Sequence, residues 1–239
     1  MMIMKSRDVL KSNWRAITNT DREKGIEKPE VEKTCEGVIL LPKFDLGHKS
    51  FFQTIKERKS IRRFSNEALS LKELSFLLWT SYGVRKYVET RKVVFRTVPS
   101  AGATHPFDVY VMVFNVKGLD AGIYRYSGLK HGLCKVKLGD FRKSIVDATL
   151  GQKFVRESAV VFVLVAVPYR TEWKYKQESY KTIAIDAGHV CQNIYLASTS
   201  IDCGTCAIAA YDQEKMDGLI GVDGNEEFVV YFAPIGKLT

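Results

Sequence analysis

Hydrophobic positions recur with helical spacing in four stretches of the chain. The capping box Ser70-Leu-Lys-Glu73 opens an amphipathic helix, and Gly83 ends it. A long apolar stripe predicts a second helix over residues 182–200. Residues 51–57 and 212–217 are shorter, and each is predicted to form a single short helix. Asp140 is predicted to cap a further helix that runs through about Leu150 and stops at Gly151.

The other hydrophobic stretches have the character of strands. Residues 108–116 are rich in Val, Tyr and Phe, and residues 122–126 and 133–138 flank turn residues as the arms of a hairpin do. Residues 160–167 are apolar without alternation, which predicts a central strand buried on both faces. The last predicted strand covers residues 227–233. Helices mixed with a few strands indicate an α+β fold.

Three stretches have no clear period. Residues 1–50 are polar and mixed, and we interpret them as an irregular arm that embraces a partner chain, ahead of one domain over residues 51–239. Residues 168–180 are polar and aromatic and are predicted to be a long loop, of the kind that often forms a functional lid. The stretch before Pro99 is predicted to be a basic linker.

The net charge of the 239 residues is +9, which favours anionic partners such as nucleic acid or a phosphorylated cofactor. The cations are scattered and no nucleic-acid-binding motif is present, so no nucleic acid partner is expected. No apolar run approaches the roughly 20 residues that cross a bilayer, and the start of the chain lacks the core of a signal peptide. We therefore expect a cytoplasmic protein without a membrane partner.

The five cysteines form no recognisable framework. Their odd number and irregular spacing are a poor basis for disulfides. Cys203 and Cys206 have the C-x-x-C spacing, but zinc would need a second pair or two histidines, and no such motif is present. We expect plain buried or cofactor-side cysteines and no metal site, with a redox pair as the weaker alternative.

The segment Glu57-Arg-Lys-Ser-Ile-Arg-Arg-Phe64 concentrates cations around two apolar residues. In an extended chain Arg58, Ser60 and Arg62 share one face. Two guanidinium groups and a hydroxyl that converge suit a phosphate, which arginine binds with two parallel hydrogen bonds. From these residues alone, a solvated basic turn is an equally good interpretation.

The segment Pro99-Ser-Ala-Gly-Ala-Thr-His-Pro106 brackets small residues with two prolines immediately before a strand. Such a low-bulk loop lets the backbone approach a flat or bulky group. An ordinary compact turn is the alternative. Neither segment identifies a function by itself.

Taken together, the chain resembles the FMN-dependent nitroreductase superfamily and, within it, the azoline dehydrogenase subgroup often called SagB-type. The resemblance covers about residues 50–237 and depends on five segments in the family's order. They are Arg58–Arg62, Pro99–Pro106, the helix from Asp186 to Ala197, the turn Ile208–Asp212 and the terminal segment Pro234–Lys237.

The resemblance implies a nitroreductase-like fold, with a central, mostly antiparallel sheet flanked by helices. It also implies an intertwined homodimer with tightly bound FMN at the interface. The cofactor-binding residues carried over from the family motifs lie in the phosphate segment, the ring-facing loop, the turn at the flavin edge and the terminal segment. They are Arg58, Lys59, Ser60, Arg62, Pro99, Ser100, Ala101, Gly102, Ala209, Ala210, Gly236 and Lys237.

The first expected activity is an FMN-dependent oxidoreductase that uses NAD(P)H to reduce a nitroaromatic, a quinone or a similar small-molecule acceptor. Members of the family bring the nicotinamide to the flavin itself. The absence of a dinucleotide-binding fingerprint from this sequence therefore does not exclude NAD(P)H as the donor.

The second expected activity is that of an azoline dehydrogenase, which oxidises thiazoline or oxazoline rings in a modified peptide. The subgroup has a Lys-Tyr pair before the long helix, and Lys174 and Tyr175 stand at that place. We expect them to act as catalytic base and hydrogen-bond donor, or to shape the pocket. The Gly and two arginines that follow the pair in the subgroup are replaced here, as by Lys176. A flavin-binding sensor or storage protein is the non-enzyme alternative.

Overall fold

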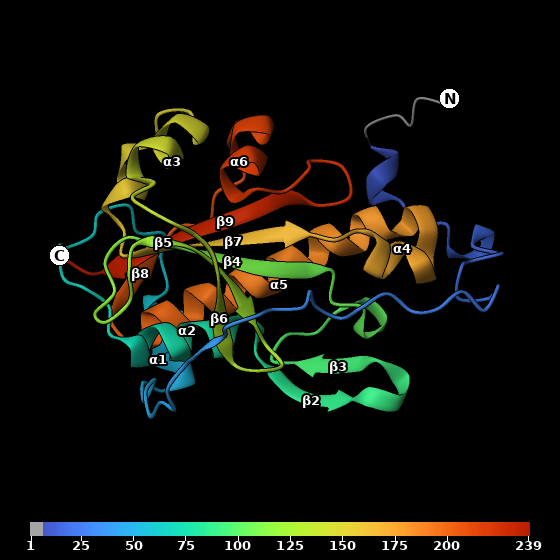
Figure 1. Ribbon diagram of the computed structural model, residues 1–239, viewed down its shortest axis with the longest axis horizontal. Coiled ribbons are helices and arrows are strands. Elements are labelled where there is room, and N and C mark those ends of the chain that lie inside the picture. The colour runs from blue at the N-terminus through green and yellow to red at the C-terminus, as the bar shows by residue number, and fades with distance from the viewer. Residues whose placement is uncertain (1–6) are drawn as a thin grey trace.

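The computed structural model describes residues 7–239, and its centre is a seven-stranded sheet (Figure 1). Every neighbouring pair of strands in this sheet is antiparallel, so the predicted mostly antiparallel sheet is confirmed. Across the sheet, the strands are β1 (Ile39–Leu40), β6 (Gly132–Leu138), β5 (Gly122–Ser127), β4 (Phe107–Val113), β7 (Val160–Ala166), β9 (Phe228–Lys237) and β8 (Cys203–Thr205).

Helices cover both faces of this sheet (Figure 1). Strand β7 alternates between two cores: Phe162 and Leu164 join one cluster, and Val161 and Val163 join the other. All four side chains are fully buried, and each contributes roughly 1.5–3 kcal/mol of hydrophobic stabilisation. The helices are α1 (Phe51–Glu57), α2 (Leu71–Tyr82), α3 (Arg142–Ala148), α4 (Tyr169–Tyr175), α5 (Ser179–Ser200) and α6 (Gln213–Ile220).

The local signals at the ends of α2 and α6 act as the sequence predicts. The Ser70 hydroxyl accepts the Glu73 amide, and the Glu73 carboxylate accepts the Ser70 amide, so the capping box of α2 is complete. The Asp212 side chain caps α6, which runs three residues beyond its predicted end before Gly221 stops it in a left-handed conformation.

The loop predicted for residues 168–180 is wrong, because α4 and a 3-10 turn (Lys176–Glu178) occupy it. Two of the helix's polar side chains are buried against the rest of the fold. Arg170 reaches Asp108 on β4, and the Thr171 hydroxyl lies 2.9 Å from that of Thr104. These distant partners stabilise a helix that has no amphipathic period of its own.

The basic linker predicted before Pro99 is also wrong. Strands β2 (Val84–Val88) and β3 (Val93–Arg96) pair there as a separate hairpin, which turns at Lys92 in a left-handed conformation. Its cations are mostly exposed. Because cations dominate this stretch of the sequence, the β-branched residues between them did not suggest strands. Strand β9 likewise runs on through Pro234, because β8 pairs only with residues 235–237 and needs no amide from the proline.

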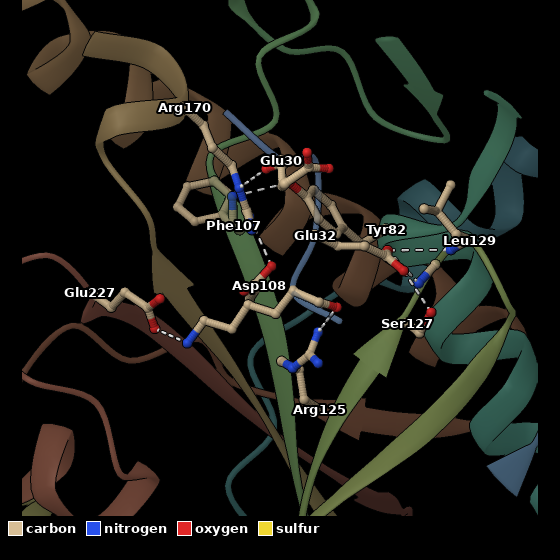
Figure 2. Close-up of polar contacts among 12 residues, drawn as sticks. Glu30, Glu32, Tyr82, Phe107, Asp108, Arg125, Ser127, Leu129, Arg170 and Glu227 are labelled. Atoms are coloured by element: carbon tan, nitrogen blue, oxygen red, sulfur yellow. Dashed lines mark hydrogen bonds and ion pairs between the residues drawn. The ribbon is translucent and has the colours of Figure 1, made fainter. Parts of the chain in front are cut away.

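The part of the arm around residues 30–34 is bonded to its own chain (Figure 2). The Glu32 carboxylate accepts the Ser127 hydroxyl at 2.6 Å, and Arg125 donates to the carbonyls of Lys33 and Thr34 at 3.1 and 2.6 Å. Arg170 donates through Nε to the Glu30 carbonyl at 3.0 Å. This part of the arm is therefore a strap across β4 and β5 of its own chain, and the expected contact of the arm with a partner chain stays a prediction.

A disulfide joins the same arm to the sheet. Cys35 in the arm and Cys134 in β6 are bridged with a Cα–Cα distance of 5.9 Å, although 99 positions separate them. The expectation that the cysteines form no disulfide is therefore wrong. Spacing along the chain gave no signal because the fold alone brings the two residues together. Cys191, Cys203 and Cys206 are free and buried.

Two further findings concern the described part of the chain. Between residues 7 and 239, none of the helices has the length and apolar character needed to cross a membrane. Over the same residues, no three His, Cys, Asp or Glu side chains gather as a metal ion would require.

The buried ion pair between Arg170 and Asp108 gives a direct test of the packing around α4. Both side chains are at most 5% exposed, and their atoms lie 2.8 Å apart. Asp108→Asn leaves a buried guanidinium without its counter-charge, so we expect unfolding in urea to require about 3–5 kcal/mol less free energy. Lys11→Met breaks a pair that is mostly exposed and is expected to cost less than about 1 kcal/mol. Equal losses in the two variants would contradict this account.

Candidate functional site

Two glycines on neighbouring strands form a trough for the basic segment. Gly204 of β8 and Gly236 of β9 are register partners. A Cβ at Gly204 would lie 2.6 Å from the Ile61 side chain, and one at Gly236 would lie 2.9 Å from the Phe64 ring. Both approaches are too close for any residue but glycine. The apolar residues of the segment are therefore the ones that face the sheet.

Backbone hydrogen bonds fix the segment in this trough. The Ile61 amide donates to the Thr205 carbonyl at 2.9 Å, and the Ser65 amide donates to the Lys237 carbonyl at 3.0 Å. Arg58 is partly exposed, and Ser60 and Arg62 are exposed. The segment thus hides Ile61 and Phe64 while its polar residues stay accessible.

Tyr195 of α5 organises the polar side of the segment. Its hydroxyl lies 3.0 Å from the Ser60 hydroxyl and accepts the Ala207 amide at 2.9 Å. The Arg58 guanidinium lies 5.3 Å from the centre of the same ring, within the range of a cation–π contact. Ser60 and Arg58 are therefore held side by side by one aromatic residue.

The donors in this region have capacity left for an anion. Arg58, Lys59 and Arg62 form no ion pair with any carboxylate among residues 7–239. Thr205 pairs with Ser60 through a parallel backbone bridge. The Thr205 hydroxyl group is buried without a hydrogen-bond partner. Unpaired cations beside hydroxyl groups are the donor set that a phosphate needs, so these residues fit the phosphate of FMN.

Lys237 stands differently from the other predicted phosphate residues. Its ammonium group forms an ion pair with Glu73, and both side chains are largely buried. Its charge therefore already has a partner within the chain, and its predicted contact with FMN stays a prediction. Gly236 has a clear structural role, because it admits the Phe64 ring.

A second cluster brings the predicted catalytic pair to the predicted ring-facing loop. Gly102 has a φ of +57°, and a Cβ there would collide with the Lys174 ammonium and the Tyr175 hydroxyl. The Lys174 Nζ atom lies 3.4 Å from the Gly102 carbonyl oxygen, to which it donates. Lys174 and Gly102 thus meet although 72 positions separate them. Pro99, at the start of the loop, is exposed.

Asp186 of α5 anchors this loop. Its carboxylate accepts the Ala101 amide at 3.4 Å, and the second carboxylate oxygen is buried without a partner. Burial raises the pKa of the Asp186 carboxyl above its ordinary value, although contacts with Ser100 and Ala101 oppose the shift. Within the loop, the Ser100 hydroxyl accepts the His105 amide at 2.9 Å.

The two clusters lie at different levels of α5. Asp186 and Tyr195 are nine residues apart, which corresponds to about 13 Å along a helix. One subunit therefore presents the phosphate segment and the ring-facing loop at separate places.

The predicted flavin-edge residues Ala209 and Ala210 are exposed. They follow Ile208, which bridges to Phe232 of β9, and the Gln152 side chain donates to the Ala210 carbonyl at 2.9 Å.

The sequence alone assigned no role to three residues that organise the site. Tyr195 and Asp186 lie inside the helix motif that carried the resemblance, but a motif match does not tell which side chains point to which loop. Thr205 follows Cys203 in a short strand that the sequence did not predict. The available signal was the number of residues between Asp186 and Tyr195. It gives their distance along the helix but not the loops that each side chain contacts.

Gly102 is the position at which this arrangement is most easily tested. Gly102→Ala puts a side chain into a left-handed conformation and against Lys174 and Tyr175, so we expect a loss of about 1–2 kcal/mol of stability and displacement of both side chains. Urea unfolding measures the first effect, and tyrosine and tryptophan fluorescence reports the second. Gly218→Ala is the control, because a Cβ in that helical position meets no atom within 4 Å. We expect it to stabilise the chain by about 0.5–1 kcal/mol, and a Gly102→Ala variant of equal stability would contradict the packing.

The chain is similar to several known proteins. The model of the nitroreductase family matches residues 55–237. A Methanocaldococcus jannaschii protein named as a nitroreductase is 31% identical over 199 residues, which cover 83% of this chain and 96% of that protein. A Ralstonia eutropha crystal structure, also named as a nitroreductase, has a TM-score of 0.71 at 28% identity and covers 89% of this chain and 94% of the other.

Two further similarities are consistent with the SagB-type subgroup. The trifolitoxin operon protein TfxC of Rhizobium leguminosarum is 22% identical over 209 residues, 83% of this chain, which spans 58% of TfxC. A chain of the E. coli microcin synthetase McbBCD complex, solved with truncated pro-MccB17 bound, shares the fold with a TM-score of 0.64 at 19% identity. That likeness covers 78% of this chain and 73% of the other. The match over residues 55–237, together with the M. jannaschii relative, shows that this chain belongs to the nitroreductase family.

Proposed function

We propose that the protein is an FMN-dependent oxidoreductase that takes electrons from NAD(P)H and reduces a small acceptor such as a nitroaromatic or a quinone. The observation that carries the proposal is the outward row of Arg58, Ser60 and Arg62 without a carboxylate partner in the described chain. Family membership supports the oxidoreductase class. FMN, when bound, supplies a ring that accepts and delivers a hydride.

The chain's own residues have separate tasks in this proposal. Arg58, Ser60 and Arg62 bind the phosphate, and Lys59 adds positive charge nearby. Lys237 would reach the phosphate only by leaving its ion pair with Glu73. The loop at Ser100, Ala101 and Gly102 offers a low-bulk surface to the ring, and Asp186 keeps that loop in position. The amides around Ala209 and Ala210 face the flavin edge.

We also propose that the protein works as a homodimer with each FMN held by both subunits. The support for this proposal is an exposed face of α5. The face of α5 that carries Ile185 and Gly188 offers a surface for the partner. Ile185 is 47% exposed, and a Cβ at Gly188 would meet open space.

An azoline dehydrogenase is the second candidate, and the Lys174–Tyr175 geometry favours it. Both side chains reach Gly102 in the ring-facing loop. There a base would take one proton from the azoline ring, bound FMN would accept the accompanying hydride as the ring becomes aromatic, and a hydrogen-bond donor would hold the ring in place. The likeness to TfxC supports a role beside a peptide-processing system. The replaced Gly and arginines after the pair weigh against it, so the reductase stays first.

The phosphate assignment predicts the behaviour of a double variant. Arg58→Ala with Arg62→Ala is expected to purify folded, with an unchanged far-ultraviolet circular dichroism spectrum, but without bound FMN. Arg63→Ala removes an exposed cation of the same segment and is the matched control, expected to keep FMN. Stoichiometric FMN in the double variant would refute the phosphate assignment.

The choice between the two activities is tested with the FMN-loaded protein under anaerobic conditions. For a reductase, NADH or NADPH bleaches the visible flavin absorbance, and a nitroaromatic or quinone restores it. If neither nucleotide bleaches the flavin while an azoline-containing peptide does, the azoline dehydrogenase replaces the reductase. A protein that takes up no FMN would exclude both activities and also the flavin-binding sensor.

A further inference from the structure

The N-terminal arm forms one wall of a cavity beside the predicted catalytic pair. The cavity has a volume of about 490 Å³, within the usual range of small-molecule sites. Figure 1 shows the N-terminal segments lying next to α4, which supplies the other wall. The residues that line the cavity are Trp14, Ile17, Thr20, Arg22, Glu23, Lys174 and Tyr175.

Hydrogen bonds to α4 and to the turn after it fix this part of the arm. The Asn13 amide donates to the Glu178 carboxylate at 2.9 Å, and the Arg22 amide donates to the Trp173 carbonyl at 3.0 Å. The Trp173 indole donates in turn to the Ile26 carbonyl at 2.8 Å. The arm is therefore bound at both ends of the cavity and shapes a defined wall.

The cavity combines aromatic surface with the proposed reaction site. The Trp14 ring stands edge-on to the Tyr175 ring, with centroids 5.1 Å apart and planes at 89°. Tyr175 and Lys174 also contact Gly102 in the ring-facing loop. A ligand against Trp14 thus lies one side chain away from the surface that the flavin ring is proposed to cover.

The cavity also carries an excess of positive charge. Over residues 7–239, neither Arg22 nor Lys174 is paired with a carboxylate. The acidic lining residue, Glu23, uses its carboxylate to accept the Thr20 amide at 2.9 Å. Burial lowers the pKa of the neighbouring Lys28, and the charges of Lys174 and Arg22 lower it further, so three cations act on one volume.

We propose that this cavity binds the electron acceptor and that it selects a flat conjugated ring bearing an anionic group such as a carboxylate. Arg22 and Lys174 bind the anion, and Trp14 and Tyr175 contact the ring. Arg22 and Trp14 are thereby specificity residues supplied by the arm. The assignment rests on the proposed function, because it takes the Gly102 loop as the surface under the flavin.

Calorimetric binding to the FMN-loaded protein tests the charge selection with two probes of similar size, 4-nitrobenzoate and neutral 4-nitrobenzyl alcohol. Wild type is expected to bind the benzoate about tenfold more tightly, because an arginine–carboxylate contact adds to the ring contacts. Arg22→Gln should reduce this preference, because Lys174 alone then faces the carboxylate. Trp14→Ala should weaken both probes alike. Arg15→Gln is the control and should leave both affinities unchanged. Arg15 is an exposed cation in the same short turn as Trp14 and does not line the cavity.

The other outcomes overturn the proposal in distinguishable ways. Equal affinity of wild type for the two probes, or a preference of unchanged size in Arg22→Gln, refutes the anion site. If Arg22→Gln instead slows flavin reduction by NADPH and not by NADH, the anion is the donor's phosphate and the acceptor assignment is wrong. Failure of the wild-type protein to take up FMN defeats the proposed function. Absence of charge selection in wild-type protein that still cycles its flavin defeats this inference alone.

Discussion

The arrangement of the site depends on the contact between two facing glycines and two apolar side chains. Because Gly204 and Gly236 lie opposite each other on β8 and β9, Ile61 and Phe64 can approach the sheet more closely than any larger residue would allow. Burial of Phe64 and the close contact of the half-buried Ile61 with Gly204 determine which way the basic segment faces. The guanidinium groups are thus oriented by hydrophobic contacts on the opposite side of the same backbone, and Tyr195 then holds Arg58 and Ser60 in place.

Helix α5 connects the two functional clusters. Its Tyr195 contacts the phosphate segment, and its Asp186 holds the loop at Gly102. Both contacts are made from one rigid element, so their spacing does not depend on loop conformation. Asp186 is a buried carboxyl with an unpaired oxygen, which costs stability that a neutral side chain would not. Such a cost is typical of positions retained for the geometry they impose.

Elements with strong local signals could be predicted from the sequence, and elements stabilised from a distance could not. The capping box at Ser70 and the buried run of β7 carry their structure in neighbouring residues. Helix α4 depends on Asp108, more than sixty residues away, and the Cys35–Cys134 bridge depends on the whole sheet. The family motifs predicted the phosphate segment and the ring-facing loop, but the contact between Gly102 and Lys174 required the tertiary structure.

The strap at Glu32 has a consequence for the order in which the molecule assembles. The strap is synthesised early, yet its partners Ser127 and Arg170 lie 95 and 140 positions downstream of the residues they bind. It has nothing to dock on until β4, β5 and α4 have formed, so a segment that is synthesised before these elements reaches its place after them. The segment that carries Trp14 and Arg22 also needs α4 before it can dock, because it bonds to Trp173 and Glu178. The nascent protein therefore passes through a stage in which the sheet is built while the cavity beside Lys174 is still open.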